Sequence, residues 1–315
     1  MKYFLTGGTG FIGGELASQL RRAGHTVHAL VRDPARAQRL SQLGVDLFKG
    51  DVTDRPSLRA PMSGVDGVFH VAGWYKISSK DAGNAYPVNV EGTRNVLETM
   101  RELQVPKGVY TSTVAVFSDT HGRLVDESYR HNGPWLSVYD HTKWQAHYEV
   151  AEPMMKKGLP LVIVQPGAVY GQGDTSVLHD LVVQYLRGKL RAVPKEPAYC
   201  FATVEDTARG HLLAMERGRP GEAYILAGER KSVVEVLEMA ERLTGVPAPK
   251  THPPAWFVRF LAALSRSERL RVATATYIAS NAKAVHELGF QPTPLSEGLP
   301  PYLRYEQEQL RQGPR

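Results

Sequence analysis

The first twenty residues constrain the fold most strongly. A short apolar run at residues 2–5 leads into the segment Thr6-Gly7-Gly8-Thr9-Gly10-Phe11-Ile12-Gly13, and a helical pattern then extends to Leu20. This order of strand, glycine turn and helix is the context in which spaced glycines predict a dinucleotide site. The first glycine permits the tight turn, the second lets the backbone approach a pyrophosphate, and the third allows close packing of helix on strand. The helix N-terminus then faces the phosphates.

The end of the second predicted strand, residues 26–31, indicates which dinucleotide is bound. An acidic side chain at this point commonly accepts hydrogen bonds from the ribose 2′-hydroxyl of NAD. Here Val31 holds the position and Arg32 follows it, and a guanidinium can bind a 2′-phosphate through two hydrogen bonds. Asp33 and Pro34 form a pair typical of a helix N-cap followed by the first helical residue. The sequence therefore predicts NADP as the cofactor.

Strand and helix patterns continue to alternate along the chain. Such alternation predicts a parallel sheet covered on both faces, with right-handed crossovers. The last of the helices is expected to be kinked near Pro153. The expected strands lie at residues 45–48, 67–71, 107–112 and 159–164, and the expected helices at 34–43, 84–103 and 137–157.

Tyr139 and Lys143 are the candidate acid/base pair. Their spacing puts both side chains on one face of a helix, about one turn apart. A free tyrosine has a pKa of about 10, and a neighbouring ammonium group favours the phenolate. The same spacing is common on solvated helix faces, so the pair alone does not indicate catalysis. Other motifs in the chain are needed to support that role.

After Gly171 the pattern becomes less regular. The stretch 255–264 is apolar except for Arg259, which favours an amphipathic helix in the core or over the substrate, with binding to a membrane surface as the alternative. The other expected elements are helices at 177–190, 232–243 and 281–288 and a strand at 223–227.

Composition excludes several classes of protein. The 315 residues carry a net charge of +6, but the basic residues are scattered, so neither a nucleic acid nor a membrane is an expected partner. No histidine or cysteine spacing predicts a metal site. The single cysteine, Cys200, excludes an intrachain disulfide and fits a reducing cytoplasm. The N-terminus begins directly with a strand, where a signal peptide is not expected.

Nearly the whole chain resembles the extended short-chain dehydrogenase/reductases, most closely in style the dihydroflavonol-4-reductase-like branch. Besides the glycine turn and Tyr139-x-x-x-Lys143, further family motifs occur in the family's order. They are Gly50-Asp51-Val52, Phe69-His70-Val71-Ala72-Gly73, Asn89-Val90-x-Gly92-Thr93, Thr111-Ser112-Thr113, Pro166-Gly167-x-Val169-Tyr170-Gly171 and Phe201-Ala202-Thr203-Val204-Glu205-Asp206-x-Ala208.

The resemblance implies a doubly wound Rossmann domain at residues 1–170 and a smaller C-terminal α/β substrate domain at 171–315, partly interleaved with the first. It implies that Thr113 binds the substrate oxygen, that Tyr139 is the acid/base, and that Lys143 holds ribose hydroxyls and lowers the pKa of Tyr139. Asn89 would support a proton relay, and a homodimer is the default assembly. The implied cofactor-binding residues are Gly7, Thr9, Gly10, Phe11, Ile12, Gly13, Arg32, Asp51, Val52, Ala72, Gly73, Tyr139, Lys143, Pro166 and Val169.

Several of these residues have a second interpretation. Ser112 carries a hydroxyl as Thr113 does, so local chemistry does not separate the two. Asp51 could be a turn residue after Gly50, and His70 could pack at the end of a strand. Four aromatic residues are candidates for lining the cleft or for ordinary packing: Trp74, Tyr75, Trp135 and Tyr199.

The leading functional prediction is hydride transfer between NADP(H) and a ketone, aldehyde or alcohol of small size. One alternative is a nucleotide-sugar epimerase or dehydratase, and a second is a dinucleotide-sensing protein without turnover. Epimerases of the family usually have an arginine and an asparagine where this chain has Gln165 and Ala168. They usually carry a further diphosphate-binding arginine near Tyr199-Cys200. These departures argue against a sugar nucleotide, unless Arg187, Lys189 or Arg191 replaces the missing charges.

Overall fold

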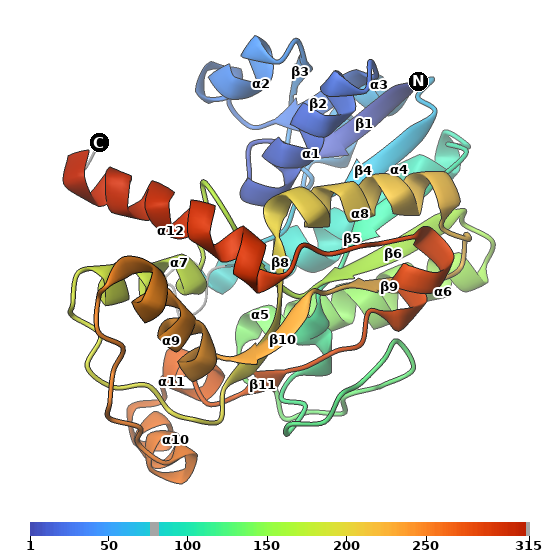
Figure 1. Ribbon diagram of the computed structural model, residues 1–315. Helices are drawn as coiled ribbons and strands as arrows, with labels where there is room; N and C mark the ends of the chain where they lie inside the picture. The colour runs from blue at the N-terminus through green and yellow to red at the C-terminus, as the bar shows by residue number, and fades with distance from the viewer. Residues whose placement is uncertain (76–81, 313–315) are drawn as a thin grey trace.

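Seven strands form the central sheet of the computed structural model, which describes residues 1–75 and 82–312 (Figure 1). The strand order is β3-β2-β1-β4-β5-β6-β9, and every neighbouring pair is parallel. This is the doubly wound parallel sheet that the sequence predicts. The bounds are β1 (Lys2–Thr6), β2 (Thr26–Val31), β3 (Asp46–Lys49), β4 (Gly67–His70), β5 (Gly108–Thr111), β6 (Leu161–Pro166) and β9 (Ala223–Leu226).

Helices cover both faces of this sheet because its strands are apolar on both sides. In β1, Leu5 packs against one layer of helices and Phe4 against the other. The first layer contains α1 (Phe11–Arg22), α2 (Gln38–Gln42) and α8 (Val204–Arg217). The opposite layer contains α3 (Arg55–Met62), α4 (Gly92–Glu102) and the helical segments that precede β6.

The strand order reverses beside β1, which lies between β2 and β4. Ligands of open α/β sheets bind at such a point, outside the carboxyl ends of the strands. Gly7 follows β1 there and Ala72 follows β4, and the two turns touch: a Cβ added to Gly7 would lie 2.6 Å from the Ala72 nitrogen. The fold therefore puts the predicted dinucleotide turn at the switch point.

The C-terminal part of the chain builds a second, smaller sheet. β8 lies between β10 and β11 and also pairs with β7. Yet β9 and α8 return to the large sheet, so the two parts are interleaved. The bounds are β7 (Ala168–Tyr170), β8 (Ala198–Thr203), β10 (Glu229–Ser232), β11 (Thr276–Tyr277), α7 (Val177–Leu186), α9 (Val233–Thr244), α10 (Ala255–Ser265), α11 (Glu268–Val272) and α12 (Leu295–Gln312).

The helix predicted at 137–157 is split into three segments. α5 (Val138–Gln145) passes into a π-helical turn, Ala146–Ala151, before α6 (Glu152–Lys156). The Glu152 amide bonds to the carbonyl of His147, five residues back. Pro153 has no N–H to continue the α-helical pattern, and an i→i+5 turn next to it absorbs the mismatch. The sequence predicts a kink near Pro153, whereas the structure has this π-turn before it.

Other boundaries also differ from the prediction. The helix expected at 84–103 begins with a 3₁₀ turn, Ala82–Asn84, and a π-turn, Pro87–Glu91. The helix expected at 34–43 is a 3₁₀ turn, Pro34–Arg36, followed by α2, and the one expected at 281–288 contains a π-turn, Ala284–Leu288. The strands β7, β8, β10 and β11 were not predicted, because short strands that alternate weakly in polarity leave little trace in a sequence.

The helix expected at 255–264 is present as α10, but its larger side chains do not enter the core. Ala255, Val258 and Ala262 are its buried residues, while Trp256 and Leu264 are about seven-tenths exposed, at 70% and 69%. The expectation that this helix packs in the core is therefore wrong. In the part of the chain that the structure describes, no helix is both long and apolar enough to cross a membrane.

Candidate active site

The glycine turn is built by close backbone contacts. Gly7 has φ +75°, which a residue with a Cβ rarely adopts. A Cβ at Gly13 would lie 2.2 Å from the Gly7 carbonyl oxygen, so only glycine lets α1 pack this closely on the turn. A Cβ at Gly10 would meet nothing within 4 Å except the Gly7 oxygen, at 3.2 Å. The outer side of Gly10 is therefore open to a ligand.

The N-terminus of α1 offers unpaired backbone donors. Gly10 is its N-cap and supplies no side-chain acceptor, and the first amides of a helix, here those of Phe11, Ile12 and Gly13, have no partner within the helix. Thr9 and Gly10 are exposed. Free amides, a positive helix end and an open glycine form a cradle for a phosphate group. The residues present therefore fit the pyrophosphate of a dinucleotide.

The end of β2 has the charge pattern expected for a 2′-phosphate. Val31 is buried, whereas Arg32 is exposed and forms no ion pair with the described residues. The Asp33 carboxylate accepts a hydrogen bond from the Ala35 amide, at 3.0 Å, and Pro34 follows it. The helix-entry interpretation of Asp33 is thus confirmed, and its carboxylate is engaged by the backbone.

Two motif residues line the turn after β3. Asp51 Oδ1 accepts hydrogen bonds from the Thr53 amide, at 2.9 Å, and from the Thr53 hydroxyl, at 2.8 Å. Asp51 therefore shapes the turn, whether or not it also borders an adenine. Val52 is buried, and its side chain would touch a Cβ placed on Gly92 at 2.7 Å. This contact sets the distance between the turn and α4.

His70 has a structural role. Its Nδ1 lies 2.8 Å from the Thr6 hydroxyl and its Nε2 lies 3.0 Å from the Thr93 hydroxyl. The side chain is fully buried, and burial lowers the pKa of His70 to about 3. Thr6 also accepts a hydrogen bond from the Ala72 amide, at 3.2 Å. His70 thus stays neutral and joins the ends of β1 and β4 beneath the site.

Thr113 and Tyr139 meet beyond the carboxyl end of β5. Thr113 is buried and caps the 3₁₀ turn Val114–Phe117 by accepting a hydrogen bond from the Ala115 amide, at 3.1 Å. Tyr139 lies in the first turn of α5, partly buried. Burial raises the pKa of Tyr139 to about 12, and a hydrogen bond with the Thr113 side chain offsets part of that rise. The two hydroxyls therefore share one position, where they could bind the oxygen of a carbonyl group.

Lys143 lies one turn further along α5 and is buried. Its ammonium nitrogen donates to the Thr111 carbonyl, at 2.7 Å, and to the Tyr110 hydroxyl, at 3.3 Å. Burial lowers the pKa of Lys143 to about 7. Burial of the phenol is the largest influence on the pKa of Tyr139, and the lowering of that pKa by Lys143 stays a prediction.

Asn89 connects the loop after β4 to α5. Its Oδ1 accepts from the Trp74 amide, at 2.7 Å, and its Nδ2 donates to the Trp74 carbonyl and to the Thr142 hydroxyl, each at 3.0 Å. A Cβ added to Gly73 would lie 3.4 Å from Asn89 Oδ1 and 3.8 Å from Lys143 Nζ. Gly73, Asn89 and Lys143 are thus brought together, and Asn89 acts first as a tether for the loop.

The remaining predicted residues lie around this centre. Pro166 ends β6 and pairs with Leu226 of β9, while Val169 lies in β7 beside β8. Trp74 is buried, and the Tyr75 hydroxyl lies 2.8 Å from that of Thr175. The other two aromatic residues are packed: Trp135 stacks on His141, and Tyr199 stacks on Tyr277.

Comparison with known proteins identifies the family. The model of the NAD dependent epimerase/dehydratase family matches residues 3–227. The chain belongs to this family. The match confirms the resemblance to the extended short-chain dehydrogenase/reductases, a family of enzymes that use a nicotinamide dinucleotide.

Relatives within the family include both reductases and epimerases. A "Putative dihydroflavonol 4-reductase" of Synechocystis sp. is 33% identical, covering 94% of this chain and 92% of its own. "Cinnamoyl-CoA reductase 1" of Oryza sativa subsp. japonica is 31% identical, covering 94% and 87%. The crystal structure of PA4631, a nucleoside-diphosphate-sugar epimerase from Pseudomonas aeruginosa, has a TM-score of 0.81 and 25% identity, covering 99% and 98%. Fold and family therefore do not distinguish a reductase from an epimerase, and the residues of the site have to.

Two residues of this family member were missed by the sequence analysis. Tyr110 holds Lys143, as described above, and His147 Nδ1 lies 2.7 Å from the Ser112 hydroxyl. His147 follows Lys143 by four residues, as Lys143 follows Tyr139, so the spacing could have predicted it. Ser112 is bonded to His147, whereas the Thr113 side chain is the one that hydrogen-bonds Tyr139.

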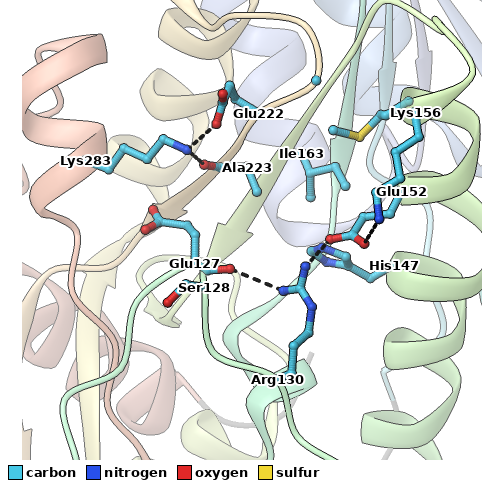
Figure 2. A pocket seen from close by; sticks show the side chains of 12 residues that line it. Glu127, Ser128, Arg130, His147, Glu152, Lys156, Ile163, Glu222, Ala223 and Lys283 are labelled. Atoms are coloured by element: carbon cyan, nitrogen blue, oxygen red, sulfur yellow. Dashed lines mark hydrogen bonds and ion pairs between the residues drawn. The ribbon is translucent and has the colours of Figure 1, made fainter.

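A separate cavity of about 360 Å³ opens behind β6 and β9 (Figure 2). Its charged lining is largely paired: Arg130 with Glu152, and Lys283 with Glu222 at 2.6 Å. His147 contributes to its wall, but no predicted site residue does. Because these charged side chains are paired with each other, the lining does not indicate a ligand for this cavity. Among the described residues, no group of three or more metal-binding side chains is placed to hold an ion.

Proposed function

We propose that this protein catalyses NADP(H)-dependent reduction of a ketone or aldehyde, or the reverse oxidation. The observation that carries the proposal is the meeting of Thr113 and Tyr139 at the carboxyl end of β5. Lys143 and Gly73 lie beside them, on the side of the glycine turn. Two hydroxyls aimed at one point can bind a carbonyl oxygen and stabilise the charge that develops there.

The residues of the site divide the chemistry between them. A bound nicotinamide supplies or accepts the hydride. Tyr139, which burial keeps protonated at neutral pH, donates a proton to the carbonyl oxygen in the direction of reduction. Thr113 polarises the same oxygen. Lys143, held by Thr111 and Tyr110, is positioned to bind hydroxyl groups of the nicotinamide ribose and to add positive charge beside the phenol.

The preference for NADP rests on the end of β2. Arg32 is exposed there without an ion-pair partner among the described residues, and no acidic side chain takes the place of Val31. A guanidinium and a 2′-phosphate form a charge-assisted, bidentate pair. We therefore assign the 2′-phosphate to Arg32.

A nucleotide-sugar epimerase remains the second candidate, supported by the likeness to the Pseudomonas aeruginosa structure. Three positions argue against it. Gln165 and Cys200 are both buried, each 1% exposed, and Tyr199 is stacked on Tyr277. None of these side chains offers a diphosphate the charged donor that it would need after losing its water. The similarity to a dihydroflavonol 4-reductase and a cinnamoyl-CoA reductase points the same way, and neither suggests a non-catalytic sensor.

The test is a screen of ketones and aldehydes for NADPH oxidation by the purified protein. Tyr139→Phe keeps the ring and removes the proton donor, so turnover should fall by about 10²–10⁴-fold while NADPH binding persists. Lys143→Met should reduce both turnover and NADPH affinity. A parallel titration with uridine- and deoxythymidine-diphosphate sugars tests the rival. Full activity of Tyr139→Phe, or conversion of a sugar nucleotide into its epimer, would overturn the proposal.

A further inference from the structure

The helix α10 presents an apolar face to solvent. Trp256, Phe260 and Leu264 are four residues apart and 70%, 56% and 69% exposed, and Phe257 and Leu261 continue the same face. Its buried side chains are small, those of Ala255, Val258 and Ala262, and Arg259 also ties the helix to Asp119. α10 lies at the lower end of the molecule as drawn in Figure 1. A soluble surface rarely gathers so many large apolar side chains without a partner.

Arginines lie on and next to α10. Residues 255–272 contain four arginines and one glutamate, a net charge of +3 out of +6 for the whole chain. Arg259, Arg266 and Arg271 line a hollow of about 570 Å³ beside α10, where Asp119 is the acidic neighbour. Arg259 pairs with Asp119 at 3.3 Å, and the Nε of Arg271 has no hydrogen-bond partner among the described residues. The hollow therefore has spare positive charge.

We propose that α10 docks on the surface of an anionic lipid bilayer. Its aromatic and leucine side chains would enter the boundary between headgroups and acyl chains, and the arginines would bind lipid phosphates, the arrangement of an interfacial amphipathic helix. The helix has 11 residues, too few to span a bilayer. Two copies meeting through this face would bring two patches of net charge +3 together, so a second copy of the chain fits less well.

The docked face lies next to the catalytic helix. Glu268, at the start of α11, accepts a hydrogen bond from the Val138 amide, one residue before Tyr139. Leu136, two residues earlier, lines the basic hollow. Docking would thus hold the start of α5 near the lipid surface. The proposal departs from the expectation that no membrane is a partner, because the sequence pattern did not reveal which side of the helix is buried.

The test is co-flotation of the full-length protein with vesicles of phosphatidylcholine alone or mixed with phosphatidylglycerol. We expect binding to the anionic vesicles that weakens as salt is added, together with a blue shift of Trp256 fluorescence. Phe260→Ser with Leu264→Ser should weaken binding by about 100-fold, or tenfold for each side chain. Replacing Arg266 or Arg269 by Gln should weaken it by about fivefold each.

Matched controls separate docking from misfolding. Both serine substitutions are at exposed positions, so circular dichroism should stay unchanged. Leu124→Ser and Leu243→Ser also remove exposed leucines, 60% and 48% exposed, but elsewhere, and should bind vesicles normally. Absence of wild-type binding to anionic vesicles would overturn the proposal, as would undiminished binding of the double variant. If the wild type is a dimer that does not bind vesicles, and the double variant is a monomer, the face binds a second copy of the chain instead. None of these readouts requires enzymatic activity.

Discussion

At the scale of single residues, neighbouring hydrogen bonds decide which hydroxyl can meet a substrate. Ser112 and Thr113 have the same chemistry and adjacent positions, but Ser112 is bonded to His147 at 2.7 Å while Thr113 is bonded to Tyr139. A hydroxyl that is hydrogen-bonded to a buried histidine has a structural role. Removing the Ser112 hydroxyl should therefore affect stability, and removing the Thr113 hydroxyl should affect turnover.

Thr113→Val should lower turnover by about tenfold or more, because one of the two donors at the carbonyl oxygen is lost, and should lower the free energy of unfolding by about 0.5–2 kcal/mol, because the cap of the turn Val114–Phe117 is lost too. Ser112→Ala should keep most of the turnover and lower the free energy of unfolding by about 1–3 kcal/mol, since it leaves His147 without its partner. Steady-state kinetics and urea unfolding of both variants measure the two effects. The reverse pattern would assign the substrate contact to Ser112.

Arg32→Ala should weaken NADPH binding by about ten- to a hundredfold and leave NADH binding almost unchanged, because only NADPH carries the phosphate that the guanidinium would bind. Fluorescence titration with each dinucleotide gives the two affinities. Arg36→Ala, a nearby exposed arginine within the 3₁₀ turn, is the matched control. Equal affinities of the unmodified protein for NADPH and NADH would contradict the assignment.

At the scale of elements, the start of α5 shows how a helix positions Tyr139, the proposed acid/base. Ser137 caps the helix through the Asp140 amide, and the Asp140 carboxylate accepts from the hydroxyls of Ser137, at 2.8 Å, and Tyr277, at 3.0 Å. Asp140 lies beside Tyr139, and burial raises the pKa of Asp140 from 3.8 to about 7. The element thus contains a buried acid that titrates near neutrality.

This raised pKa makes stability depend on pH. Between about pH 4 and 7 the folded protein keeps a proton on Asp140 that the unfolded chain releases, so stability falls as the pH rises, by up to about 1.4 kcal/mol per pH unit. Asp140→Asn should remove this contribution. From pH 4.5 to pH 7.5, the free energy of unfolding of the variant should therefore rise by about 2–4 kcal/mol relative to that of the wild type. Urea unfolding at both pH values measures it. Ser137→Ala, which keeps the carboxyl group, should retain the pH dependence; equal behaviour of wild type and Asp140→Asn would contradict the argument.

At the scale of the whole molecule, side chains from distant segments of the chain close the open edge of the large sheet. β9 is the edge strand, and its Ile225 amide donates to Glu127, 98 residues earlier, at 2.9 Å. Lys283 donates to the Ala223 carbonyl, also at 2.9 Å. Figure 2 shows Lys283 beside Ala223, with Glu127 below them in the view. The C-terminal part of the chain is thereby tied to the dinucleotide-binding part.

Glu127→Ala should lower the free energy of unfolding by about 1–3 kcal/mol, because it leaves a buried amide without an acceptor. Hydrogen exchange at Ile225 should become faster. Glu222→Ala removes a more exposed carboxylate that pairs with Lys283 and should cost at most about 1 kcal/mol. Similar losses in the two variants, with unchanged exchange at Ile225, would show that the edge is closed in another way.

The sequence by itself determined the architecture and the family. Positions 7 and 13 have to be glycine because of backbone contacts as short as 2.2 Å, and apolar strands alternating with amphipathic helices allow few folds other than a doubly wound sheet. Those constraints are local, so they can be seen in the order of the residues. The position of Asp33 as a helix cap was predicted for the same reason.

Only the tertiary structure decided what depends on burial and on distant neighbours. The pKa of Tyr139 rises because the phenol is buried, and no spacing rule contains that information. The choice between Ser112 and Thr113 depends on His147, which lies within the π-turn Ala146–Ala151. The exposure of the apolar face of α10 is equally invisible in its pattern, because an amphipathic sequence fixes which side chains share a face but not what covers it.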